Sequence, residues 1–240
     1  MNRTTSFLLN QTILIDAGTG VGDLSHAELV AIEHVFITHS HLDHIACLPL
    51  LLDATLGSRE NPVTVHASAA TIAILQKHIF NWQILPDFSV IPSAEAGFLR
   101  YSPLEVGETY SLGDMSITAL AAEHTVPAVA YQLNNGRASI IFSGDTVGGD
   151  AFWHSVNQIA NLTTLIIETA FADRESRLAK MAKHLCPSTL ATELLNLPSH
   201  VQVLITHLKP ADSELTISEV LALDHIHPIR RLLQGEILEF

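Results

Sequence analysis

The chain has 240 residues, of which 48% are hydrophobic, and this length can bury one substantial core. Its 25 acidic residues outnumber 12 basic ones, and the net charge of −13 argues against binding to long nucleic acids. The apolar runs at 7–15 and 48–52 are too short to span a bilayer, and no removable leader is evident. We therefore expect a single domain over residues 1–240, cytoplasmic and without a membrane partner.

Short β-branched runs alternate with segments whose apolar residues recur at helical spacing. The predicted strands are 5–9, 12–16, 35–38, 63–66, 117–120, 138–143, 165–168 and 201–206. The predicted helices are 25–32, 44–56, 69–80, 151–159, 174–184 and 188–197. Strands come first in hairpins and then alternate with helices, which predicts an α/β fold of two sheets with helices on their outer faces.

Polar residues follow the apolar strands where the strands end. They are Asp16, His39, Asp145, Glu168 and His207. Loops at one sheet edge are expected to gather these side chains, because rigid strands hold reactive groups in place while the loops shape a pocket.

The segment His39-Ser40-His41-Leu42-Asp43-His44 delivers four potential metal ligands within six residues. In extended chain, residues two apart face the same way, so His39 and His41 are expected to bind one ion together. Asp43 and His44 then point toward a second ion. The alternative makes Asp43 a helix N-cap in a polar loop, but three imidazoles and a carboxylate bury poorly unless something binds them. These ligands suit Zn²⁺, Mn²⁺ or Fe.

This segment resembles the HxHxDH signature of the metallo-β-lactamase superfamily, which implies a four-layer αββα sandwich and further ligands. A later histidine, an aspartate after a strand and a last histidine are matched in order by His124, Asp145 and His207. Singly, each of these is an ordinary residue. The resemblance implies two divalent ions, Zn²⁺ first, the first ion bound by His39, His41, His124 and Asp145, and the second by Asp43, His44, Asp145 and His207.

Two segments around Glu168 and His184 resemble the paired Glu and His loops of the phosphodiesterase branch of this superfamily. The resemblance implies that His184 donates to the phosphate or the departing oxygen and that Glu168 holds its tautomer. Asp43, Glu168 and His184 are thus the candidate catalytic residues. The alternative is a helix-end histidine and a strand-end glutamate with no such role.

Residues 78–88 are similar to the aromatic insertion of class II cyclic nucleotide phosphodiesterases, whose HSHLDHI, HTVPAV and THLKP-like strings also occur here. Phe80, Asn81 and Trp82 are therefore candidate substrate contacts, with the rings of Phe80 and Trp82 either stacking a purine or closing a lid over the site. A dimer contact or plain core packing is the alternative. Leu85 departs from the second tryptophan common in that family. Members also carry a strand before Arg3, so the first sheet is expected to lack it or the chain to start at another codon.

The function expected from this resemblance is hydrolysis of cAMP or cGMP to the 5′-nucleotide, with a metal-bridging hydroxide attacking phosphorus. Chemistry alone leaves lactones, thioesters and β-lactams open. A tRNA 3′-processing endonuclease is the runner-up. Such an enzyme would need a basic docking surface or a flexible Gly/Pro-rich arm to hold its tRNA, and this sequence shows neither. A non-catalytic nucleotide-binding protein of the same fold is the third alternative. A homodimer is expected from the resemblance only.

Overall fold

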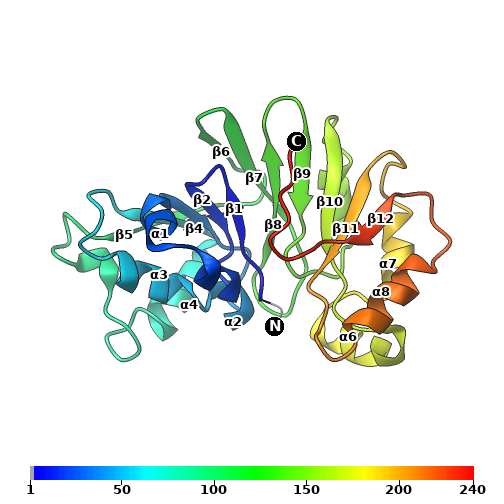
Figure 1. Cartoon of the computed structure of the whole chain (residues 1–240), viewed down its shortest axis with the longest axis horizontal. Coiled ribbons are helices and arrows are strands. Elements are labelled where there is room, and N and C mark those ends of the chain that lie inside the picture. Colours follow the sequence, from blue (N-terminus) through cyan, green and yellow to red (C-terminus); the bar gives the residue numbers. More distant parts are fainter. Residues whose placement is uncertain (1–2) are drawn as a thin grey trace. The chain divides into compact units, whose positions relative to one another are not determined.

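The computed structural model describes residues 3–240. Contacts between Cα atoms divide the chain into two compact units, Met1–Leu104 and Glu105–Phe240, called the N-unit and the C-unit below. Each unit contains one mixed sheet with helices (Figure 1). The predicted α/β class with two sheets is confirmed, while the single domain remains a prediction. Among the described residues, no helix is both long and apolar enough to cross a membrane.

The sheet of the N-unit has five strands in the order β1-β2-β3-β4-β5. An antiparallel hairpin of β1 and β2 opens it, and the remaining pairs are parallel. The strands are β1 (Phe7–Leu9), β2 (Ile13–Ile15), β3 (His34–Phe36), β4 (Val63–Ala67) and β5 (Leu99–Pro103). The helices are η1 (Thr19–Asp23), α1 (His26–Ala31), α2 (Leu42–Ile45), α3 (Leu48–Thr55), α4 (Ala69–His78) and η2 (Phe88–Val90).

The sheet of the C-unit has seven strands in the order β12-β11-β10-β9-β8-β7-β6. Strands β6 to β9 pair antiparallel, and β9 to β12 pair parallel. The strands are β6 (Thr109–Leu112), β7 (Met115–Ala121), β8 (Val129–Asn134), β9 (Ser139–Phe142), β10 (Leu162–Glu168), β11 (Gln202–Thr206) and β12 (Ile229–Arg231). The helices are α5 (Asp150–Val156), η3 (Asp173–Glu175), α6 (Ser176–Ala182), α7 (Pro187–Leu194) and α8 (Ser213–Leu221).

Each sheet buries alternate strand residues against helices. In the N-unit, Val35 and Val65 share a core cluster with residues of α3 and α4. In the C-unit, Leu165 and Ile167 of β10 pack with Leu190 of α7, in a cluster that also contains residues of α5 and α8. Because successive side chains of a strand point to opposite faces of its sheet, only every second residue of these strands faces the helices.

All eight predicted strands are present, and each predicted helix is found with shifted ends. The predicted helix 44–56 is broken into α2 and α3 at Ala46 and Cys47. Pro49 explains the break, since proline has no N–H to donate and its ring clashes with the carbonyl four residues earlier. It is instead accommodated in the first turn of α3.

A pair of histidines, with His66 buried and His34 half-buried, joins β3 and β4 in the N-unit. The Nδ1 atom of His34 lies 3.0 Å from Nε2 of His66. The His66 ring stacks on Phe36 with centroids 4.2 Å apart. Burial, together with charge repulsion from His34, lowers the pKa of His66 to about 4. The native protein therefore keeps His66 neutral at pH values where the unfolded chain protonates it.

Replacing this histidine should make stability less sensitive to acid. A histidine with a depressed native pKa costs stability as pH falls from the unfolded value near 6.5 toward the folded value. We expect His66→Gln to reduce the loss of unfolding free energy between pH 7 and 5 by about 2 kcal/mol, measured by urea unfolding at both pH values. His78→Gln, at an exposed position of α4, is the control. An unchanged pH dependence in His66→Gln would refute this account.

Candidate metal centre

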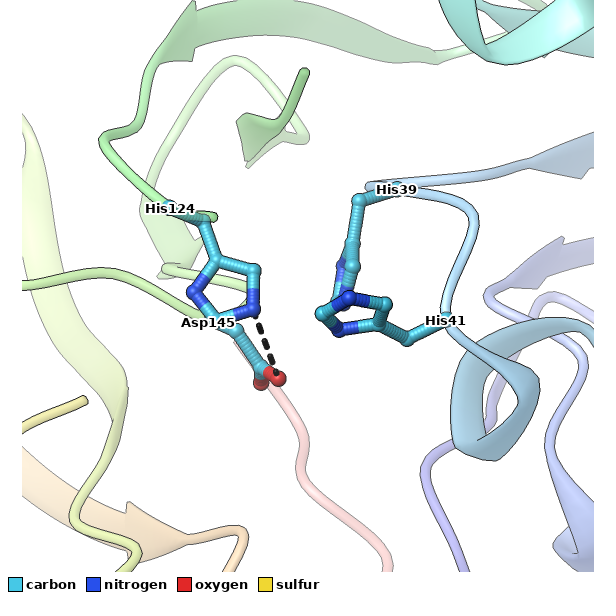
Figure 2. Close-up of side chains that lie close together, drawn as sticks. All are labelled: His39, His41, His124 and Asp145. Carbon is cyan, nitrogen blue, oxygen red and sulfur yellow. Dashed lines mark ion pairs between the residues drawn. The ribbon is translucent and has the colours of Figure 1, made fainter. Parts of the chain in front are cut away.

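The loop after β3 brings three imidazoles of the N-unit together. The ring centroids of His39 and His41 lie 4.7 Å apart, and those of His39 and His44 lie 4.2 Å apart. Figure 2 shows His39 and His41 directed to the same side of their loop, the arrangement that their spacing of two residues predicts. His39 and His44 are fully buried. Such crowding of buried imidazoles suits a cation that accepts their lone pairs.

A buried carboxylate beneath this loop orients two of its residues. Asp16 follows β2 and accepts a hydrogen bond from Nδ1 of His44 at 2.6 Å. It also accepts from the backbone N–H and the hydroxyl of Thr38, at 2.7 and 2.8 Å. Burial raises the pKa of Asp16, against the opposing charge of His44. Because the Thr38 hydroxyl donates to Asp16, its oxygen is left to accept from Nδ1 of His39 at 3.0 Å.

Asp43 lies within the first turn of α2, and His41 occupies the N-cap position. The alternative interpretation of Asp43 as an N-cap is therefore not realised. Gly18 approaches the backbone of this turn closely, since a Cβ atom built on Gly18 would lie 2.3 Å from the carbonyl oxygen of Asp43. The neighbouring Ala17 also donates its N–H to the carbonyl of His44 at 2.7 Å. The segment after β2 thus fixes the turn that carries Asp43 and His44.

Adding one methyl group at Gly18 should displace this turn. We expect Gly18→Ala to lower the unfolding free energy by roughly 1–3 kcal/mol, the usual cost of overpacking, and to weaken metal binding. Gly22→Ala is a matched control, because its Cβ would meet no atom within 4 Å. Thermal unfolding and metal content of both variants test this. Equal behaviour of the two variants would show that the close approach is not important.

In the C-unit, adjacent parallel strands deliver polar residues to one edge. Asp145 lies beyond the end of β9, Glu168 ends β10, and His207 follows β11. Ligand atoms of Asp145, His184 and His207 lie within 4.8 Å of one another and could hold a metal ion. Nδ1 of His207 lies 3.2 Å from Oδ1 of Asp145. Nε2 of His124 lies 3.9 Å from Oδ2 of Asp145, the pair marked by the dashed line in Figure 2.

Glu168 and His184 form a buried hydrogen-bonded pair beside this cluster. Nδ1 of His184 donates to Oε1 of Glu168 at 2.7 Å. Three backbone N–H groups, from Thr146, Ala170 and Leu185, also donate to the Glu168 carboxylate at 3.1–3.3 Å. Burial raises the pKa of the Glu168 carboxyl, although the hydrogen bond and charge of His184 act in the opposite direction. Burial lowers the pKa of His184, but the bond to Glu168 and its charge outweigh this effect, so the net pKa is raised.

The donor set fits divalent metal binding. In His39, His44 and His124, Nδ1 is held by Thr38, Asp16 and the carbonyl of Lys183 respectively. Metal-binding histidines characteristically donate one ring N–H to a carboxylate, carbonyl or hydroxyl, which fixes the tautomer and leaves the other nitrogen to bind. Imidazole and carboxylate ligands in this arrangement suit Zn²⁺, Mn²⁺ or Fe.

The aromatic segment divides into residues with different roles. Phe80 belongs to the core of the N-unit and is 2% exposed, with its ring edge-on to Phe88 at 6.1 Å. Its predicted stacking on a substrate is therefore wrong, since core side chains cover the ring. The Asn81 side chain donates to the carbonyl of Lys77 and accepts from Gln83 and Ile84, so it organises the turn. Trp82 is 65% exposed and remains a candidate contact.

The sequence did not assign Asp16, Thr38 and Lys183 as residues that orient the histidine ligands, although it marked Asp16 as a polar residue at the sheet edge. Asp16 stands out as a strand-end carboxylate, and that position was the signal for its role. Thr38 and Lys183 carry no such signal, because the first acts by its hydroxyl and the second by its backbone carbonyl. Lys209 was also missed, although its Nζ atom lies 3.1 Å from Nε2 of His207.

Residues 11–208 match the family described as Beta-lactamase superfamily domain. A probable 3′,5′-cyclic-nucleotide phosphodiesterase of Yersinia pestis is 26% identical over 209 residues, covering 75% of this chain and 58% of that protein. A ribonuclease Z of Thermococcus kodakarensis is 29% identical over 126 residues, covering 50% of this chain and 37% of that one. This chain thus spans less than two thirds of the length of these relatives.

The fold is similar to that in the crystal structure of unliganded yeast PDE1. The TM-score is 0.73 at 24% sequence identity, and the match covers 86% of this chain and 67% of that one. This likeness confirms the expected fold class. At this identity it carries no information on activity.

Proposed function

This chain belongs to the metallo-β-lactamase superfamily, and from that membership we propose that it is a metal-dependent phosphodiesterase acting on 3′,5′-cyclic nucleotides. The observation that carries the proposal is the buried Glu168–His184 pair beside Asp145 and His207. An imidazole held by Glu168 next to candidate metal ligands suits an anionic phosphodiester better than a neutral lactone or thioester, because its Nε2 atom is left to donate to phosphate oxygens.

We propose two divalent ions, Zn²⁺ first, as the resident metals. His39, His41, His124 and Asp145 would hold one, and Asp43, His44, Asp145 and His207 the other. Bound ions of this kind supply Lewis acidity and lower the pKa of water, which is what phosphodiester hydrolysis requires. The support is the HxHxDH signature together with the oriented ligands within each unit.

The residues of the chain then have separate tasks. His184 would donate its Nε2 proton to a phosphate oxygen or to the departing O3′, since its Nδ1 proton is already bonded to Glu168. Glu168 would orient His184 and favour its protonated form. Asp16 and Thr38 would hold the rings of His44 and His39 in place before substrate binds. Trp82 is exposed and would stack against the base.

A cyclic nucleotide is preferred over precursor tRNA for electrostatic reasons. The net charge of −13 opposes binding of a long polyanion, whereas a small phosphodiester needs only the local charge of the metals. The ribonuclease Z relative keeps tRNA 3′-processing as the second candidate. We also propose a homodimer, which the sequence resemblance alone supports.

Substrate assays should distinguish these activities. We expect chelator-sensitive hydrolysis of bis(p-nitrophenyl) phosphate, and turnover of cAMP or cGMP to the 5′-nucleotide without cleavage of precursor tRNA. The assays should be run on protein whose metal content is measured in the same sample. Cleavage of precursor tRNA with no action on cyclic nucleotides would select the second candidate. Metal-loaded protein inactive on all of them would support a non-catalytic binding protein.

Two substitutions should separate metal binding from catalysis. Asp145→Ala should abolish metal occupancy and activity together, because this carboxylate is proposed to bridge both ions. His184→Ala should lower turnover about 10²-fold or more, the usual contribution of a proton donor, with metal retained. Elemental analysis and kinetics test both, with His154→Ala, at an exposed position of α5, as control. Loss of metal from His184→Ala would instead make His184 a ligand.

A further inference from the structure

Helix α6 ends in a left-handed residue that is not glycine. Lys183, its C-cap, has φ 53° and ψ 53°. This conformation is disfavoured for residues with a Cβ, and helices usually place glycine there. The turn is closed by hydrogen bonds from the Lys183 N–H to the carbonyl of Lys180 at 3.3 Å and from the His184 N–H to that of Ala179 at 2.9 Å.

The carbonyl exposed by this turn orients a candidate metal ligand. Nδ1 of His124 lies 3.0 Å from the carbonyl oxygen of Lys183 and must donate to it, since a carbonyl can only accept. The proton is thereby fixed on Nδ1, and the lone pair of the ring is placed on Nε2. That atom is on the side of Asp145, 3.9 Å from its Oδ2 atom.

The same turn also presents the next residue to the candidate site. His184 follows directly and bonds to Glu168. Its ring centroid lies 4.9 Å from that of His124. One backbone conformation therefore sets both rings: the carbonyl of Lys183 holds His124, and the chain direction after Lys183 places His184.

The Lys183 side chain contributes less than its backbone. Its Nζ atom lies 3.1 Å from Oε1 of Glu123, but the two side chains are 40% and 61% exposed. Ion pairs between such exposed groups add little stability because water and salt screen them. A β-branched residue, in contrast, is strongly disfavoured at positive φ and would move the carbonyl.

We propose that the left-handed turn at Lys183 is a positioning element that jointly orients His124 for metal binding and His184 for the phosphate. This inference rests on the proposed metal-dependent function. It assigns the effect to the backbone conformation of Lys183 and not to its charge. Loss of a hydrogen-bond partner that orients a metal-binding histidine typically costs about 10- to 100-fold in metal affinity.

The test compares two substitutions at this position. Lys183→Gly removes the side chain and favours the left-handed conformation, so metal affinity should stay within about 3-fold of the unsubstituted protein, well short of the loss expected when the orienting bond is broken. Lys183→Val should weaken Zn²⁺ binding about 10- to 100-fold, and lower turnover even when metal is saturating, since His184 is displaced. Zn²⁺ affinity is measured by competition with a chromogenic chelator, and turnover with bis(p-nitrophenyl) phosphate.

Gln11→Val is the matched control, because Gln11 also has positive φ, 67°, but lies at an exposed turn between β1 and β2. Its Zn²⁺ affinity should be unchanged. If Lys183→Val does not fold, the smaller Lys183→Thr replaces it. Equal weakening in the Gly and Val variants would assign the effect to the lysine side chain, and no weakening in either would remove the positioning role. Failure of the unsubstituted protein to bind Zn²⁺ would refute the proposed function itself.

Discussion

Hydrogen bonds to Nδ1 fix the histidines on which the candidate metal centre depends. His44, His39 and His124 each hold this atom against an oxygen supplied by a carboxylate, a hydroxyl or a backbone carbonyl. Without such a partner, an imidazole can change tautomer or rotate, and its free nitrogen is no longer directed to one place. The structure thus needs buried acceptors at defined positions, and the strand ends and one helix end provide them.

Parallel strand pairing explains why these acceptors and ligands are found near each other within a unit. In the C-unit, β9, β10 and β11 are adjacent and parallel, so residues directly beyond their carboxyl ends share one edge. In the N-unit, β2 and β3 are paired in the same way, which brings Asp16 under the loop of His39 and His44. The same rule places ligands at the carboxyl ends of strands in other open α/β sheets.

Much of this arrangement could be predicted from the sequence, because apolar runs mark buried strands and polar residues directly after them mark the edge. Edge strands were less accessible: β5 ends in Pro103, and β12 has only Ile229 as an apolar residue. Strand β8 and helix α8 were missed despite buried apolar residues at suitable spacing. The burial of Phe80 could not be predicted either, since composition does not tell whether an aromatic residue in a loop faces solvent or core.

The Glu168 carboxylate connects several loops as well as orienting His184, so replacing it changes structure and chemistry together. Its two oxygens collect N–H groups from Thr146, Ala170 and Leu185, which belong to three separate loops, in addition to the ring of His184. Removing the carboxylate would take this acceptor from the buried amides of Thr146 and Leu185 and loosen their loops, while the Ala170 N–H keeps its second bond, to the carbonyl of Leu185 at 3.1 Å. A rate defect on replacing Glu168 therefore mixes architecture with chemistry, and a shape-preserving amide substitution separates them only incompletely, because its NH₂ group would face a donor.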